Sequence, residues 1–366
     1  MKKIFVSEPL FEGNELKYLK ECIKTSWISS GKYIKQFENN FSKFCDVKYA
    51  ITTSNGTNAL DTALLALGIK EGDEVIVPDL TYVSTANTVV HVGAKPVFVD
   101  VDKDTWTIDP EKIEQKITKK TKAIIVVHLF GHPADMDAIN KIAKKHNLFV
   151  IEDACQAHGS LYKGKKIGSL GDIACFSFSG AKVITTGEGG MVVSKNKKLI
   201  DKAYDIKTNY TSKKHKFYHT QVGHNFRFTN LQAAVGVAQL ERIDQLIEMK
   251  ITNAKYYIKQ LKELETFIQL PDEKIWAKNT YWLFSIVIKR PNFRDKLINY
   301  LADNSIETRP FFVPMNELPM FNDADKYSTA KYLSENGICL PSGVTLKKKE
   351  IEFIVTKIKN FFSSHD

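Results

Sequence analysis

Short apolar runs recur between residues 48 and 195, and helix candidates separate them. Several runs are continuously apolar, as in AIIVVHLFG (123–131), which is typical of strands covered on both faces. Asp109-Pro110 fits the start of one helix as its N-cap and first helical residue. The alternation predicts an α/β fold with helices on both faces of a mostly parallel, seven-stranded sheet. The expected strands are 49–53, 74–78, 95–101, 123–131, 148–154, 173–179 and 190–194, and the expected helices are 57–67, 84–91, 110–117 and 135–146.

The pattern changes after Gly223. Thr229 can cap one long helix that runs to Leu261, because its apolar residues recur near helical spacing. Beyond Pro271 a smaller α+β unit is expected. We therefore divide the chain into a large domain (1–240) that begins with a helical arm, and a linking helix with a small C-terminal domain (241–366). The further elements expected are helices at 13–27, 293–303 and 348–362, a loop at 28–32, and strands at 281–289 and 306–312.

Composition narrows the class of protein. The chain has 366 residues, of which 43% are hydrophobic and 26% charged, as in an ordinary globular protein. Its net charge is +10, but the lysines are spread in pairs without a nucleic-acid motif, so we expect a solvated surface and no nucleic-acid partner. No stretch is apolar enough for a membrane span or a signal peptide. The five cysteines are scattered, which predicts a reducing cytoplasm and no metal site.

Polar motifs follow several of the expected strands. Ser54-Asn55-Gly56-Thr57 stands between the first strand and its helix. Glycine allows close approach of the backbone, and a helix start offers free N–H groups, so the motif suits a phosphate. A plain capped turn explains the motif equally well. Ligands of open α/β sheets bind outside the carboxyl ends of strands, so we expect the motifs at these ends to converge.

Asp153 ends the run LFVIEDA, and Lys182 follows one strand later in SFSGAKVITTGEGG. The carboxylate can cap a helix or pair with a protonated ring nitrogen, and Gln156 can donate a hydrogen bond beside it. A lysine forms a Schiff base with an aldehyde when its amine is not held as a solvated ammonium. Taken alone, Lys182 would be a surface residue. Its context is a buried strand before it and glycines after it, which allow a tight turn beside the amine.

Two further motifs complete the set. Tyr82, at another strand end, can stack on a ring or pack in the core. Asn225 and Arg227, just before the long helix, can reach an anion or simply form a helix-entry loop. A phosphate cradle, a ring-nitrogen partner and an amine are the protein groups that a pyridoxal phosphate enzyme needs.

The motifs resemble those of the DegT/DnrJ/StrS sugar aminotransferases, and the resemblance spans nearly the whole chain. It rests on SNGT, VIEDACQAHG, SFSGAKVITTGEGGMVV and GHNFRFTNLQAA, together with ELKYLKECIKTSWISSGKYIKQFE and VVHLFGHPADMDAI. It implies a fold type I aminotransferase that works as a homodimer with shared sites. It also implies that pyridoxal 5'-phosphate and pyridoxamine 5'-phosphate alternate as its cofactor forms.

The resemblance assigns roles to individual residues. Lys182 would hold the cofactor as a Schiff base, and its presence favours transamination, because related sugar dehydratases carry histidine at this position. Asp153 would pair with the ring nitrogen, and Gln156 would lie near the ring hydroxyl. Tyr82 would cover the ring. The phosphate would be bound by Gly56, Thr57, Ser177 and the neighbouring chain's Asn225.

For the substrate, the pattern is closest to enzymes that aminate C4 of GDP-4-keto-6-deoxymannose with L-glutamate. Compared with them the chain has Gln156 for glutamate, Asn316 for histidine, GHNFRFT for G-Y-N-Y-R-M-T, and a different segment at 207–214. An aminotransferase for a dTDP- or UDP-linked keto-hexose and a non-catalytic cofactor-binding regulator are alternatives. A nicotinamide enzyme would need G-x-G-x-x-G after an early strand, where SNGT stands. The candidate substrate residues are Trp27, Lys32, Arg227, Arg309 and Asn316, although Arg309 fits domain packing as well.

Overall fold

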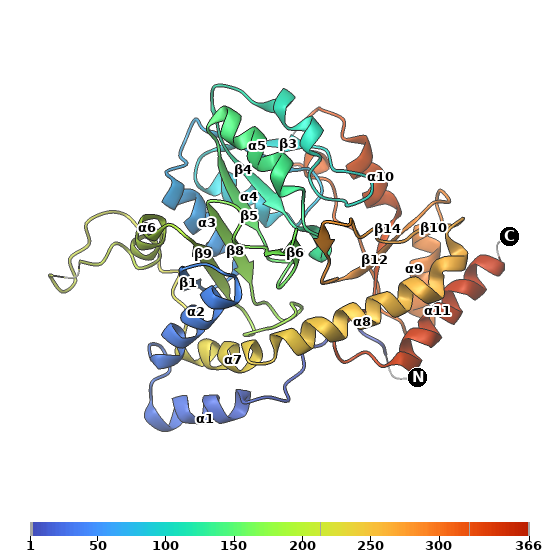
Figure 1. The fold of residues 1–366 in the computed structure, drawn as a ribbon, viewed down its shortest axis with the longest axis horizontal. Coiled ribbons are helices and arrows are strands. Elements are labelled where there is room, and N and C mark those ends of the chain that lie inside the picture. Colours follow the sequence, from blue (N-terminus) through green and yellow to red (C-terminus); the bar gives the residue numbers. More distant parts are fainter. Residues whose placement is uncertain (1–2, 213, 322, 365–366) are drawn as a thin grey trace.

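A computed structural model describes residues 3–212, 214–321 and 323–364. Its centre is a seven-stranded sheet of order β1-β9-β8-β5-β4-β2-β3 (Figure 1). All neighbours pair in parallel except β9, which runs antiparallel to β1 and β8. The expected mostly parallel sheet is therefore confirmed. Its strands are β1 Tyr49–Thr53, β2 Glu74–Pro78, β3 Lys95–Val99, β4 Thr121–Val127, β5 Phe149–Asp153, β8 Ile173–Ser177 and β9 Gly190–Ser194.

Helices bury both faces of this sheet, which explains the continuously apolar strands. In β4, Ile124 and Val126 belong to one apolar cluster, whereas Ala123 and Ile125 belong to the other. A polar residue at any of these positions would therefore face one of two cores. Helices α2 Lys32–Phe44, α5 Met136–His146 and α7 Asn230–Leu240 contribute to the first cluster, and α3 Gly56–Leu67, α4 Ser84–His91 and α6 Lys197–Lys207 to the second.

A second sheet, of order β10-β12-β14-β13, lies beside the first (Figure 1). The N-terminal segment is attached to this part of the molecule. Ile4 forms a parallel bridge with Ile306, and Val6 accepts a hydrogen bond from the Ser342 N–H at 2.9 Å. The elements here are β10 Ile268–Gln269, β12 Phe284–Ile288, β13 Arg309–Pro310, β14 Gly337–Leu340, α9 Arg294–Asp303, α10 Ser328–Asn336 and α11 Lys348–Ser363. A three-stranded sheet is formed by β6 Leu161–Tyr162, β7 Lys165–Lys166 and β11 Ala277–Lys278.

The long helix expected after Thr229 is two helices. Thr229 does cap α7 and forms a capping box with Gln232, but α7 ends at Leu240 and α8 begins at Ile243 (Ile243–Leu261). Arg242, with φ of −116° and ψ of 6°, departs from helical geometry at the junction. Apolar spacing continues through this break, so periodicity alone could not reveal it. The N-terminal helix is α1, Glu15–Thr25.

The expected helix at 110–117 is wrong. The segment forms two single-turn 3₁₀ helices, η1 Pro110–Lys112 and η2 Glu114–Lys116. Asp109 caps the first, as the Asp-Pro pair predicts, but Ile113 is the segment's only buried residue. One buried side chain provides no apolar stripe to hold a regular helix against the sheet.

Several expected strands are shorter than their apolar runs. The run 123–131 stops at Val127, because Phe130 takes a left-handed conformation (φ 52°) within η3 Leu129–Gly131. The run 281–289 becomes β12 only at Phe284, since Tyr281 also has a positive φ of 48°. The run 306–312 is reduced to Arg309–Pro310.

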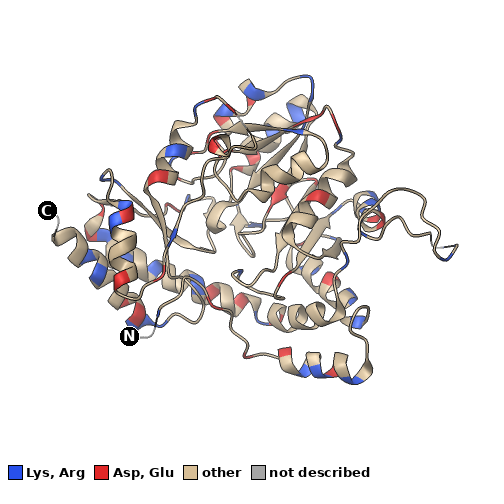
Figure 2. Cartoon of the chain, turned by 180° about the vertical axis from the view of Figure 1, so that it is seen from behind, with Lys and Arg blue, Asp and Glu red and all other residues tan. Residues whose placement is uncertain are grey.

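Charged residues are interspersed over the outer helices and loops (Figure 2). None of the helices in the described part of the chain combines the length and hydrophobicity that a bilayer span requires.

Candidate active site

A cavity of about 500 Å³ lies at the carboxyl ends of the parallel strands. Residues that follow β1, β2, β5 and β8 line it, together with residues from the second sheet. The predicted convergence of motifs therefore occurs in a single chain. Eight of the sequence candidates line this cavity: Gly56, Thr57, Tyr82, Asp153, Gln156, Ser177, Lys182 and Arg309.

The N-terminus of α3 forms one end of the cavity. Asn55 caps the helix by accepting a hydrogen bond from the Asn58 N–H at 2.8 Å. A Cβ at Gly56 would lie 2.8 Å from the Ser177 Cβ and 3.1 Å from the Cys155 Sγ. Thr57 hydrogen-bonds to Ser84 at 2.9 Å, which adds hydroxyls at this end. Free helical N–H groups, hydroxyls and the positive end of the helix dipole suit a phosphate.

Asp153 ends β5 with its side chain 5% exposed. It accepts hydrogen bonds from the Thr85 hydroxyl at 2.8 Å and from the Cys155 N–H at 3.2 Å. No side chain in residues 3–364, apart from the undescribed 213 and 322, forms an ion pair with it. A buried, oriented carboxylate without a protein cation can hold a protonated ring nitrogen.

Gln156 lies beside Asp153, and its side-chain oxygen is already used. This oxygen accepts a hydrogen bond from the Phe130 N–H at 2.9 Å. The amide nitrogen is thus the group that remains to donate into the cavity.

Lys182 projects from the turn between β8 and β9. Its backbone N–H donates to the Ser179 carbonyl at 3.0 Å. The Phe178 N–H donates to the Gly189 carbonyl at 2.8 Å, and the Phe178 carbonyl accepts from the Thr186 N–H at 2.9 Å. Burial lowers the pKa of the Lys182 ammonium to about 8, opposed by Cys155 and Asp153. Burial therefore favours the neutral amine that a Schiff-base lysine requires.

The glycines after Lys182 have two different uses. Gly187 has a φ of 83° and open space around its Cα, so it serves the turn itself. A Cβ at Gly190 would lie 2.2 Å from the Asn55 carbonyl oxygen. Gly190 thus permits β9 to approach the α3 N-terminus.

Asn225 and Arg227 are exposed and do not line the cavity of their own chain. Their segment lies next to the cavity's helix end, because the Ser54 N–H donates to the Phe226 carbonyl at 3.1 Å. Within the divergent segment 207–214, Lys207 is buried and donates to the Thr52 carbonyl at 2.5 Å. Lys213 lies outside the described residues.

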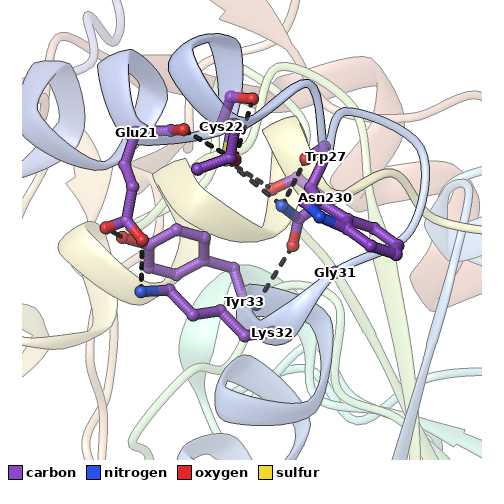
Figure 3. Close-up of a pocket in the computed structure, with 8 residues that line it drawn as sticks. Glu21, Cys22, Trp27, Gly31, Lys32, Tyr33 and Asn230 are labelled. Atoms are coloured by element: carbon purple, nitrogen blue, oxygen red, sulfur yellow. Dashed lines mark hydrogen bonds and ion pairs between the residues drawn. The ribbon is translucent and has the colours of Figure 1, made fainter.

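Trp27 and Lys32 line a different pocket (Figure 3). This pocket shares no lining residue with the Lys182 cavity. Lys32 forms an ion pair with Glu21, whose carboxylate also accepts a hydrogen bond from the Tyr33 hydroxyl at 2.8 Å. The Asn230 side chain donates to the Trp27 carbonyl at 2.6 Å. These contacts fix the loop 27–32 against α7, with the Trp27 side chain exposed.

Asn316 also lies outside the cavity. Its N–H donates to the Asp79 carboxylate at 2.9 Å, and its amide donates to the Asp325 carbonyl at 3.0 Å. Both contacts hold the loop after β13 instead of presenting the side chain to the cavity.

The structure adds lining residues that we did not predict, among them Glu188, Trp282 and Phe312. It also shows Thr85 as the partner of Asp153. Glu188 could have been found as the one charged residue in GEGG. Trp282 precedes β12 and Phe312 follows β13. No sequence pattern indicates that these two residues lie close to Lys182.

Known proteins resemble this chain over nearly its full length. Residues 9–359 match the model of the DegT/DnrJ/EryC1/StrS aminotransferase family. The chain belongs to this family. It is 47% identical to GDP-perosamine synthase of Escherichia coli O157:H7, over 99% of this chain and 100% of that protein. The synthase of the same name from Vibrio cholerae is 43% identical over 98% and 99%.

The expected aminotransferase fold is confirmed by a solved structure. DesV of S. venezuelae, crystallised with a ketimine intermediate, superposes with a TM-score of 0.90 and 32% identity, covering 95% of this chain and 94% of its own. The family is one of pyridoxal phosphate-dependent enzymes, and the cavity fits this cofactor. Gly56 leaves room that a Cβ would fill, Asp153 is a buried carboxylate that forms no ion pair with the described residues, and Lys182 supplies the amine.

Proposed function

We propose that this protein converts a nucleotide-linked 4-keto-6-deoxy sugar to the 4-amino sugar, with L-glutamate as amino donor. The proposed substrate is GDP-4-keto-6-deoxymannose and the product GDP-perosamine. The convergence of eight candidate residues around the Lys182 amine carries the catalytic part of the proposal. The identity of 43–47% to GDP-perosamine synthases over full length supports the choice of sugar.

Pyridoxal phosphate, when bound, supplies an electron sink for the carbanion formed at the amino donor or product. In this proposal Lys182 would hold the cofactor through its amine, and the same amine would act as the general base for the substrate's proton. Burial lowers the pKa of this amine to about 8, which favours the neutral form that this role needs. Asp153 would keep the ring nitrogen protonated, the Gln156 amide would donate a hydrogen bond beside the ring, and Tyr82 would cover the ring.

The remaining groups would bind phosphate and substrate. Gly56, Thr57 and Ser177 surround the helix end that suits the phosphate. Arg309 lines the cavity and carries the positive charge for a carboxylate or diphosphate. Because the other candidates lie outside the cavity of their own chain, we propose a homodimer whose partner subunit supplies them. These are Trp27, Lys32, Asn225 and Arg227, while Asn316 would act from the loop after β13.

In the proposed division, residues 1–240 bind the cofactor, and residues 241–366 close the site from the second sheet. We further propose that the enzyme works in the cytoplasm, where nucleotide sugars are made.

The test is to replace Lys182 with alanine. Wild-type protein incubated with pyridoxal phosphate should develop the yellow absorbance of the lysine-bound cofactor, and K182A should not. With L-glutamate and a panel of GDP-, dTDP- and UDP-linked keto-sugars, mass detection should show the amino product with the GDP sugar and none with K182A. K198A, which removes an exposed lysine, is the matched control. Wild-type protein without the absorbance would refute the cofactor assignment, and amination of only a dTDP or UDP sugar would refute the substrate.

A further inference from the structure

The indole ring of Trp282 lies directly against the Lys182 amine. The Lys182 Nζ is 3.7 Å from the ring centroid, and the Trp282 side chain is 6% exposed. Trp282 precedes β12 of the second sheet, 100 residues after the lysine. A cation over an indole face is attracted by the ring quadrupole, and burial strengthens the attraction.

The same indole contacts the backbone of the lysine turn. Its N–H donates to the Ala181 carbonyl at 2.8 Å, and the Ser7 hydroxyl reaches this carbonyl at 3.4 Å. The peptide before Lys182 is therefore fixed from the second sheet and from the N-terminal segment. One side chain thus contacts the lysine at its amine and at its preceding peptide.

Trp282 is itself firmly placed. Tyr281, the residue before it, takes a left-handed conformation that is uncommon for a non-glycine residue, and the Asn279 side chain accepts its N–H at 2.7 Å. Gly131 packs against this turn, because a Cβ there would lie 2.8 Å from the Tyr281 nitrogen. The Phe130 ring stacks on the indole at 6.4 Å and 29°.

We propose that Trp282 is a positioning residue of this site. Its ring holds the Lys182 amine at the wall of the cavity, and its N–H fixes the turn from which Lys182 projects. This inference rests on the proposed role of Lys182 as the cofactor-binding amine.

The ring also bears on the charge of the amine. The titratable and charged groups that face or influence Lys182 are Asp153, Cys155, Glu188, His158 and Arg309, with Tyr82 in the same cavity. Burial and Arg309 favour the neutral amine, whereas Asp153 and Glu188 favour the ammonium. The indole face favours the ammonium too, so its removal should lower the pKa of Lys182.

The test measures how fast the cofactor-free protein captures pyridoxal phosphate as pH is varied. The absorbance change gives an apparent pKa for the amine and a limiting rate at high pH. In Trp282→Leu, which lacks both contacts, we expect the apparent pKa to fall by about half a unit to one unit. We also expect the limiting rate to fall several-fold. Trp282→Phe keeps the ring face but lacks the N–H donor, so only its limiting rate should fall.

Trp276→Leu is the matched control, because Trp276 packs on His132 and Tyr162 away from the cavity. Its pKa and rate should equal those of the wild type. An unchanged pKa and rate in Trp282→Leu would overturn the inference. If circular dichroism shows that this variant is unfolded, the limiting rate of Trp282→Phe is used instead. A lowered rate would support the inference, and an unchanged rate would overturn it. Wild-type protein that captures no cofactor would instead contradict the proposed function. Failure of the Trp282 inference and failure of the proposed function can therefore be distinguished.

Discussion

At the scale of single residues, some side chains form the site directly and others hold those side chains in place. Lys182, Asp153 and Gly56 stand in recognisable motifs at strand ends, and the cavity brings them together. Thr85 and Trp282 have no such motif. Their proximity to Asp153 and Lys182 depends on how separate elements pack, which local spacing does not encode.

Asp79 is another buried carboxylate, and it makes stability depend on pH. Its side chain is fully buried, and Oδ2 has no hydrogen-bond partner among the described residues. Burial raises the pKa of Asp79 to about 7, opposed by the Asn316 N–H. Because the folded-state pKa lies above the unfolded value, the protonated form stabilises the fold at low pH, and this stabilisation is lost as pH rises from about 4 to 7.

Asp79→Asn should therefore be more stable than wild type at pH 8, by on the order of 1–3 kcal/mol, with a much smaller difference at pH 5. Urea unfolding at the two pH values measures this. Asp303→Asn, at an exposed position at the end of α9, should show no such pH-dependent gain. A loss of stability at pH 8 in the Asp79 variant would contradict the assignment.

At the scale of elements, the site depends on close approach between segments far apart in sequence. SNGT predicts a turn and a helix start, and α3 does begin at Gly56. The sequence does not show that Gly56 abuts Ser177 or that Gly190 abuts Asn55. These contacts join residues more than 120 positions apart, so they follow from the strand order β1-β9-β8 instead of from any local pattern.

Gly56→Ala should weaken pyridoxal phosphate binding by at least tenfold, on the order of 1.4 kcal/mol or more. The added methyl would lie 2.8 Å from the Ser177 Cβ, which forces α3 and β8 apart at the phosphate end. Equilibrium absorbance titration measures the binding. Gly180→Ala is the control, since a Cβ there meets nothing within 4 Å, and it should bind normally. Normal binding by the Gly56 variant would show that the phosphate lies elsewhere.

At the scale of the whole molecule, several candidate residues lie outside the cavity of their own chain. Asn225 and Arg227 are exposed, and Trp27 and Lys32 line a pocket of their own. No pattern in a single sequence distinguishes a residue that completes its own site from one that completes a partner's site. In the proposed dimer each chain supplies residues to the active site of its partner. Mixing inactive variants tests this arrangement.

Lys182→Ala and Asn225→Ala should each be inactive or strongly impaired alone. If Asn225 acts across a two-fold interface, mixed dimers contain one intact site, and mixing should restore roughly a quarter of wild-type activity. Activity is measured after the subunits are denatured together and refolded. The control mixture, Lys182→Ala with Tyr82→Ala, should not recover, because both residues line one chain's cavity. An equal lack of recovery in both mixtures would place Asn225 in its own chain's site.

The attachment of the N-terminal segment sets an order of events during synthesis on the ribosome. Val6 is fully buried and bonds to Ser342, which is made 342 − 6 = 336 residues later. At roughly 5–20 residues per second, the segment waits about 20–70 seconds for this partner. Ile4 likewise waits for Ile306. Ile4 and Val6 thus leave the ribosome about 300 residues before their partners, so this segment stays exposed to chaperones until the second sheet is made.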